Sequence, residues 1–227
     1  ITYQLLGKIY HEVKIPRLRP RIEVATPPHV GKLPQSWTYA VGALERNPQR
    51  LKWLAQMAVK DAKAGHMVLI PLTRVPVIKA LVKAINRIAG REIAAEFHGG
   101  TPKKLRKGLI DKARNGGKHG IDVMAGNGKM LGTGINIPRA SMLYQATPNS
   151  NLPKADQRFS RVLTPMPGKL QPVVKYIIDD AELVRNCMRT EHYGCMWPVF
   201  KPLIDPITKG KLDDYFSNKK HKRRFTD

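Results

Sequence analysis

Two short stretches of the sequence hold residue types that could bind phosphate. The first reads GTGINIP at residues 132–138, and the second reads QRFSR at residues 157–161. Glycines let backbone N–H groups come close to an anion, and they can take a positive φ at little cost. An arginine adds a fixed charge on a planar fork that matches phosphate oxygens. The two stretches together predict a phosphate-facing surface made of a glycine-rich turn and an arginine-bearing helix.

The surrounding segments alternate between strand and helix patterns. Short apolar runs predict strands over residues 67–72, 93–97, 121–125, 142–146 and 173–178. Amphipathic or capped segments predict helices over residues 47–64, 77–89, 102–113, 155–163 and 181–189. This alternation favours an α/β fold, with a parallel sheet covered by helices on both faces. Ligands of such sheets bind beyond the carboxyl ends of the strands, where the turns at 98–100, 126–134 and 147–148 fall.

The charge balance points to a polyanionic partner. The 227 residues include 40 Lys and Arg against 17 Asp and Glu, which gives a net charge of +23. Such an excess repels itself unless a polyanion is present. Nucleic acid is the first candidate, and an anionic membrane surface is the second. A lysine-rich surface that only keeps the protein in solution stays open as an alternative.

Other classes of protein find little support in the sequence. No apolar run has the length of a membrane span, and the N-terminus lacks a signal-peptide pattern, so we expect a soluble intracellular protein without a membrane partner. Two cysteines are too few for a disulfide framework. Cys187, His192 and Cys195 have no evident fourth ligand nearby, and His221 could supply one only if the tail folded back, so we expect no metal site and keep this one as the alternative.

A phosphate loop of the GxxxxGK[ST] type is missing from this sequence. The nearest run ends in Lys129 and Met130, which puts a thioether where the loop needs a hydroxyl to ligate Mg²⁺. No strand carries the Asp-Glu pair that would bind a metal and water. We therefore expect that this chain alone does not hydrolyse ATP.

The order and spacing of these motifs resemble motifs V and VI of superfamily 2 helicases and translocases. Residues 67–74 are similar to motif IV of the same family, and the opening segment resembles its branch-migration and repair-type members. The resemblance covers about residues 1–180 and implies a RecA-like fold. It divides the chain into an irregular N-terminal arm at 1–36, which leads from a missing first RecA-like domain, a second RecA-like domain at 37–180, and a C-terminal extension with a basic tail at 181–227.

The resemblance also implies roles for individual residues. ATP and Mg²⁺ would be bound mainly by the first RecA-like domain of the same protein, and Arg161 would be the catalytic arginine finger. The implied ATP-binding residues are Gly134, Asn136, Gln157, Arg158 and Arg161. The implied nucleic-acid contacts are Thr73, Arg74, His98, Gly99 and Thr133. The chain departs from the family at Thr164, where a further arginine is common, and at Asn136, where aspartate is more usual.

The function that these features predict is that of the second motor domain of an ATP-dependent DNA helicase or translocase. Binding to DNA, or to RNA, would go through the phosphate backbone and be largely independent of sequence. Two alternatives stay open. One is a nucleic-acid-binding module without catalytic activity, and the other is a packaging or remodelling motor subunit that moves along duplex DNA.

Overall fold

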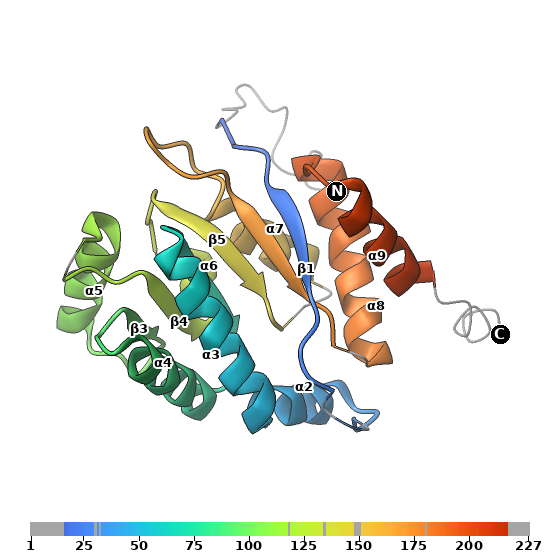
Figure 1. Ribbon diagram of the computed structural model, residues 1–227, viewed down its shortest axis with the longest axis horizontal. Helices are drawn as coiled ribbons and strands as arrows, with labels where there is room; N and C mark the ends of the chain where they lie inside the picture. Colours follow the sequence, from blue (N-terminus) through green and yellow to red (C-terminus); the bar gives the residue numbers. More distant parts are fainter. Residues whose placement is uncertain are drawn as a thin grey trace, which may run out of the picture.

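Six parallel strands form one continuous sheet at the middle of the molecule (Figure 1). The computed structural model describes residues 16–29, 31, 33–117, 119–133, 135–147, 151–179 and 181–217, without the side chains of Thr133 and Ser217. The strands are β1 (Arg21–Ala25), β2 (Met67–Leu72), β3 (Ala94–Phe97), β4 (Val123–Asn127), β5 (Ala140–Gln145) and β6 (Val173–Ile177). Their order across the sheet is β1-β6-β5-β2-β4-β3. The predicted RecA-like α/β class is confirmed.

The central strands explain why the sequence shows continuous apolar runs. Every residue of β2 and of β5 is buried, as expected for strands that are covered on both faces. All the ladders are parallel; Val68 of β2, for example, is in register with Val123 of β4. The carboxyl ends of β2, β4 and β5 therefore meet at one edge of the sheet.

Helices cover both faces of the sheet (Figure 1). In the described residues they are α2 (Trp37–Arg46), α3 (Pro48–Lys63), α4 (Val75–Ala89), α5 (Lys103–Asn115), α6 (Gly128–Thr133), α7 (Leu152–Ser160), α8 (Glu182–Glu191), the π-helix η1 (His192–Phe200) and α9 (Pro206–Ser217). Helices α3 and α4 pack on one face through residues such as Leu54, Ile78 and Leu81. The opposite core takes in α6, α7, η1 and α9, with Phe159 and Phe216 fully or nearly fully buried.

Three local signals mark two of the helix ends that the sequence predicts. Asn47 precedes α3, and its side-chain oxygen accepts a hydrogen bond from the Arg50 N–H at 2.9 Å, which satisfies a donor of the first turn. Pro48 follows as the first helical residue, where no N–H is needed. Gly90 ends α4 with a φ of 70°, a left-handed conformation that glycine adopts without a steric penalty.

Residues 1–36 were predicted to be irregular, and this is wrong for the segment at 21–25. Strand β1 pairs along its length with β6 at the edge of the sheet, and Ile22 is completely buried. The prolines at positions 20 and 27 flank this strand rather than interrupt it, and an edge strand needs only one ladder. Residues 1–15 and the basic tail after 217 lie outside the described residues, and the domain boundaries at 36 and 180 stay predictions.

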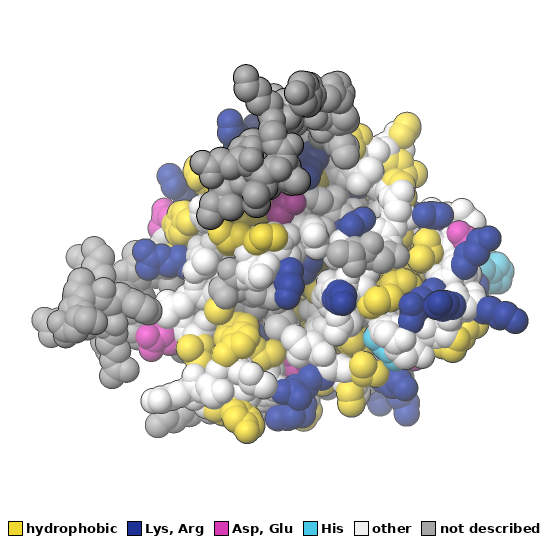
Figure 2. Space-filling model, turned by 180° about the vertical axis from the view of Figure 1, so that it is seen from behind, with side chains coloured by type: hydrophobic (Ala, Val, Ile, Leu, Met, Phe, Trp, Pro, Cys, Tyr) yellow, Lys and Arg dark blue, Asp and Glu magenta, His cyan; other side chains and the backbone are white. Residues whose placement is uncertain are grey.

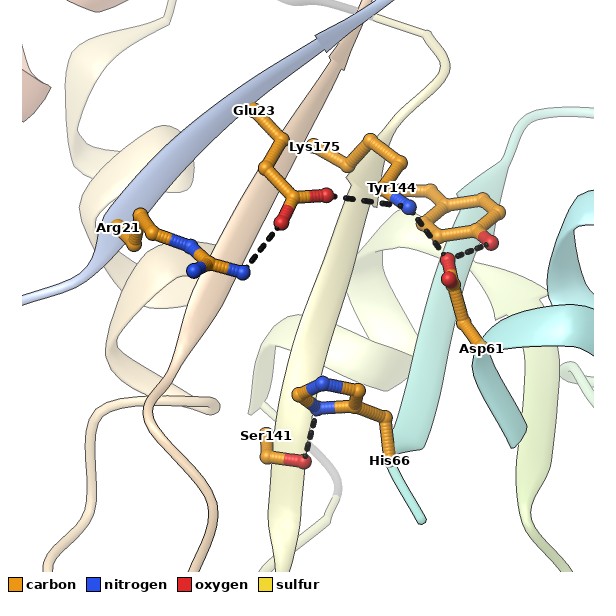
Figure 3. A network of polar contacts seen from close by, with 7 residues as sticks. All are labelled: Arg21, Glu23, Asp61, His66, Ser141, Tyr144 and Lys175. Atoms are coloured by element: carbon orange, nitrogen blue, oxygen red, sulfur yellow. Dashed lines mark hydrogen bonds and ion pairs between the residues drawn. The ribbon is translucent and has the colours of Figure 1, made fainter. Parts of the chain in front are cut away.

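A network of polar contacts ties β1 to the rest of the sheet (Figure 3). Asp61 of α3 accepts hydrogen bonds from the Tyr144 hydroxyl at 2.5 Å and from Lys175 Nζ at 2.6 Å. Lys175 Nζ also lies 3.3 Å from a carboxylate oxygen of Glu23, which Arg21 contacts in turn at 2.5 Å. Burial, reinforced by the Asp61 charge, raises the pKa of Tyr144, so its hydroxyl stays protonated and donates.

Three other segments differ from their predicted structure. Residues 128–133, predicted as a turn, form helix α6, because the Asn127 side chain accepts from the Lys129 N–H and Leu131 packs into the core. Helix α2 was not predicted. The segment after α8 was predicted as an extended wrap because of its prolines, but it is helical: Pro206 begins α9, where its missing N–H costs nothing, and Pro198 lies inside η1.

His192 gives the C-terminal helices a predicted pH dependence. Its ring is almost fully buried against Tyr176 and Phe216, and its Nδ1 lies 3.0 Å from the Tyr176 hydroxyl. Burial lowers the pKa of His192 from 6.5 to about 4, although Asp213 opposes the change. As the pH falls, His192 is therefore protonated near pH 6.5 in the unfolded chain but only near pH 4 in the folded chain. The free energy of unfolding should therefore decrease by at most about 3 kcal/mol as the pH drops from about 6.5 to about 4.

The measurement is urea unfolding of the chain across this pH range. His192→Phe keeps an aromatic ring but cannot titrate, so its stability should fall less than that of the wild type. His119→Gln replaces an exposed histidine, so the stability of this variant should depend on pH in the same way as that of the wild type. Equal pH profiles for the wild type and His192→Phe would contradict the assignment.

Candidate functional site

A cavity opens at the carboxyl edge of the sheet. It has a volume of about 640 Å³ and lies beyond the ends of β2, β4 and β5, with the first turns of α6 and α7 beside it. This is the edge at which parallel sheets bind their ligands. Its lining residues are Trp37, Pro71, Leu72, Thr73, Asn127, Gly128, Lys129, Thr147, Asn151, Pro153, Lys154, Gln157 and Arg158.

A buried carboxylate from α2 holds two of the strand ends together. Glu45 accepts hydrogen bonds from the Thr73 N–H at 2.8 Å, from the Thr73 hydroxyl at 2.7 Å and from the Thr147 hydroxyl at 2.8 Å. Thr73 follows β2, and Thr147 lies two residues after β5. Thr73 is thus placed at the cavity, as the strand pattern predicted, but its donors already have an acceptor.

Arg74 does not line the cavity, and its guanidinium contacts α2. Its Nη2 donates to the Thr38 carbonyl at 3.3 Å. The same guanidinium lies so close to Gly42 that a Cβ on that residue would be 2.7 Å from Arg74 Nη2. The absence of a side chain at Gly42 is what leaves room for the guanidinium there.

Arg158 forms the inner wall of the cavity and is almost fully buried. Its Nη1 donates to the Thr147 carbonyl at 3.1 Å, and its Nη2 contacts Glu191 of α8. Glu191 has no exposed surface and also accepts from the Gln145 amide. A buried charge is tolerated only when it is paired and hydrogen-bonded, and here the pair fixes the side-chain position of Arg158.

A second buried ion pair lies at the same edge. Arg50 of α3 donates from Nε and Nη2 to the two carboxylate oxygens of Asp179, both at 2.7 Å. It also donates to the Ala146 carbonyl at 2.8 Å, one residue before Thr147. Arg50 and Asp179 are each 1% exposed. This bidentate pair anchors α3 to the ends of β5 and β6.

Arg161 brings the two phosphate-type stretches of the sequence into contact. It follows the last residue of α7, and its Nε and Nη1 donate to the carbonyls of Gly132 and Ile135, each at 2.7 Å. Partial burial lowers the pKa of the guanidinium. Asn136 is exposed next to this contact, and its carbonyl accepts from Arg114 at 2.7 Å.

His98 and Gly99 lie at the end of β3, on the far side of β4 from Thr73. The Gly100 N–H donates to His98 Nδ1 at 3.1 Å, which leaves the proton of the neutral ring on Nε2. His98 Nε2 is buried and has no hydrogen-bond partner among the described residues. Arg106 closes the turn by donating to the Gly99 and Thr101 carbonyls.

The cavity therefore gathers three of the predicted site residues, namely Thr73, Gln157 and Arg158. The remaining described ones, Arg74, His98, Gly99, Asn136 and Arg161, do not line the cavity. Gly134 and the side chain of Thr133 lie outside the described residues. The roles given to all these residues stay predictions.

The sequence did not point to the residues that support the cavity. Glu45 and Glu191 come from helices far along the chain from the motifs, so no motif spacing predicts them, whereas Trp37 was named from the sequence as a residue that either stacks on bases or packs in the fold. A signal was present for Glu45, since an acidic residue on the apolar face of a segment in so basic a chain needs an explanation. In the part of the chain that the structure describes, no cluster of three or more His, Cys, Asp or Glu side chains could hold a metal ion. The described helices include none with the length and apolarity of a membrane span.

Comparison with known proteins gives matches in structure but not in sequence. No family model and no curated protein matches the chain. The helicase MrfA, in a crystal structure with DNA and AMPPNP, matches with a TM-score of 0.56 and 15% identity over 85% of this chain. UvsW of phage T4 matches with a TM-score of 0.53 and 22% identity over 72% of this chain.

The extent of these matches shows which part of a helicase the chain resembles. It spans only 25% of the MrfA chain and 33% of the UvsW chain. The C-terminal domain of the DEAD-box protein Dbp5 matches with a TM-score of 0.54 and 14% identity, over 78% of this chain and 84% of that domain. The described part of this chain thus has the fold of the C-terminal domain of Dbp5 and of the matching parts of MrfA and UvsW.

Proposed function

We propose that this chain is the second motor domain of an ATP-dependent helicase or translocase that acts on DNA. In this proposal an upstream RecA-like domain of the same protein binds ATP and Mg²⁺, and the present domain closes over the nucleotide. The observation that supports the proposal most directly is the contact of Arg161 with the carbonyls of Gly132 and Ile135, in a domain whose fold matches the C-terminal domain of Dbp5.

The proposed roles of the residues follow the two sequence motifs. Arg161 supplies the arginine finger, whose charge stabilises the transferring phosphoryl group. The fixed positive charge and partial burial of Arg161 suit this role, because its charge counts for more where water is excluded. Gly134, Asn136, Gln157 and Arg158 make up the rest of the ATP-facing surface. Arg161 Nε and Nη1 already donate to backbone carbonyls. When the domain closes on ATP, Arg161 must therefore either donate from Nη2 or break these two hydrogen bonds.

Nucleic acid would contact the same edge from the strand ends. The proposed contacts are Thr73, Arg74, His98, Gly99 and Thr133. A polyanionic partner is favoured by the excess of cations, since Figure 2 shows many more Lys and Arg than Asp and Glu side chains on the face that it displays. Opening and closing of the two domains would then shift these contacts along the strand in each ATP cycle.

ATP and Mg²⁺ would be held mainly by the upstream domain. In the described part of this chain, the polar groups that line the cavity are hydroxyls, amides, lysines and an arginine, which suit the phosphates of a nucleotide rather than a metal ion. Bound ATP supplies the phosphoryl group that is transferred to water. The residues of this chain would orient that group and neutralise its charge.

Matched lysine variants test the nucleic-acid part of the proposal. Lys154 lines the cavity, and Lys83 lies on the exposed side of α4, so Lys154→Gln and Lys83→Gln remove the same charge from different places. Binding of the 227-residue chain to single-stranded DNA should weaken steeply between about 50 mM and 200 mM salt. Lys154→Gln should lower the slope of log affinity against log salt by about one, while Lys83→Gln should not. No binding, or equal losses in the two variants, would contradict a contact at this edge.

A further inference from the structure

Helix α2 contributes an indole to the wall of the cavity. Trp37 is the first residue of α2 and lines the cavity, while it also packs against the small apolar cluster of Leu44, Ala181 and Val184. The other two tryptophans lie elsewhere: Trp53 packs on the α3 and α4 side of the sheet, and Trp197 is 51% exposed on η1. Trp37 is therefore held in place by its packing and still has surface to offer to a ligand.

The rest of the lining has a composition that suits an anionic ligand with an apolar part. The lining residues include the cations Lys129, Lys154 and Arg158 but no Asp or Glu. The two carboxylates behind the wall, Glu45 and Glu191, are already engaged by hydroxyl, amide and guanidinium donors. Apolar surface comes from Pro71, Leu72 and Pro153 as well as from Trp37.

A nucleotide unit combines the two properties. Its base is a flat aromatic group that stacks on tryptophan whatever its sequence, and its phosphate is attracted by lysine and arginine. The volume of about 640 Å³ is within the range of pockets that hold small ligands, roughly 300–1,000 Å³. A purely structural indole would not need to share a cavity of this volume with three cations.

We infer that this cavity takes up one nucleotide unit, with its base stacked on Trp37 and its phosphate beside Lys129 and Lys154. The occupant is a base of the bound strand, so the strand is gripped through a base as well as through its backbone. This inference rests on the proposed nucleic-acid function. Because Gln157 and Arg158 line this cavity and also belong to the proposed ATP-facing surface, a free nucleoside triphosphate is the competing occupant, and the experiment separates the two sources.

The experiment compares tryptophan variants of the 227-residue chain. Trp37→Leu keeps an apolar side chain against Leu44 and Val184 but cannot stack, and Trp37→Phe keeps a stacking ring. Trp197→Leu is the matched control, because it removes an indole from another surface. The probes are oligothymidylate, an abasic oligonucleotide of the same length, and ATP. Thermal unfolding of each variant checks that the chain is folded.

Stacking on Trp37 predicts a specific pattern. Trp37→Leu should bind oligothymidylate about tenfold more weakly, whereas its affinity for the abasic strand stays within twofold of wild type. Trp37→Phe should recover most of the loss, and Trp197→Leu should behave as wild type. Equal losses for the two strands, or no loss, would overturn the inference while leaving backbone binding intact. A loss confined to ATP would overturn the strand assignment, and a wild-type chain that binds neither strand would overturn the proposed function as well.

Discussion

Replacing Arg161 by alanine should lower the rate of ATP hydrolysis by about 10³-fold or more in a protein that joins this chain to its upstream domain. That is the size of effect expected when an arginine finger is removed from a phosphoryl-transfer site. Affinity for nucleic acid should change little, because the proposed strand contacts come from other residues. The measurement is steady-state ATPase at saturating DNA, together with a binding titration.

The structural contacts of Arg161 require a control on stability. The guanidinium donates to the Gly132 and Ile135 carbonyls, so its loss should also cost about 1–3 kcal/mol of stability. Arg161→Lys keeps the charge but not the fork, and it should lose most of the activity. Arg87→Ala, on the exposed side of α4, should leave turnover unchanged. A folded Arg161→Ala protein with normal turnover would refute the finger assignment.

Replacing Asp179 by asparagine should destabilise the chain by about 3–5 kcal/mol. The change leaves the Arg50 guanidinium buried without its counter-charge, which is the costly way to break a buried ion pair. In a chain of this size the loss corresponds to a fall in melting temperature of roughly 10 °C. Urea unfolding and thermal unfolding both measure it.

Asp156→Asn is the matched comparison. Asp156 pairs with Arg17 at 3.1 Å, but the two side chains are 36% and 40% exposed, so the same change should cost less than about 1 kcal/mol. Replacing both members of the buried pair, as Arg50→Met with Asp179→Leu, should recover part of the stability that Asp179→Asn loses. Similar losses at Asp179 and Asp156 would mean that the buried pair does not anchor α3 as described.

Periodicity and end signals were enough to predict most of the sheet. Strand β2 was predicted at its observed bounds. A short apolar run between a helix that ends at a glycine and a helix that begins near a proline fits few structures other than a buried strand. Strand β1 was missed for two reasons. Only one of its residues, Ile22, is fully buried, so its sequence shows no apolar run, and the neighbouring prolines suggested an irregular arm. Helix α2 was missed although its buried residues Ala40, Val41 and Leu44 follow a helical spacing.

The candidate site was predictable only in part. Thr73 reached the cavity because the carboxyl ends of parallel strands meet at one edge, which the order of elements already implies. The contact between Arg161 and the glycine turn also agrees with the initial reading of the two stretches. Glu45 and Glu191 could not be predicted in this way, because their partners depend on how α2 and α8 pack in three dimensions. The contact of Arg74 with α2 is a further example.

The place of β1 at the edge of the sheet has a mechanical consequence. In the proposed two-domain motor, the connection from the upstream domain passes residues 17–19, which already contact the fold, for example through the Leu18 N–H and the Leu163 carbonyl at 2.9 Å, before it reaches β1. A pull along that strand runs parallel to its axis, so the bonds from β1 to β6 share the load at once instead of opening one after another. The Lys175 bridge to Asp61 adds a crosslink between this strand and the interior. The joint should therefore transmit force between the domains with little stretching.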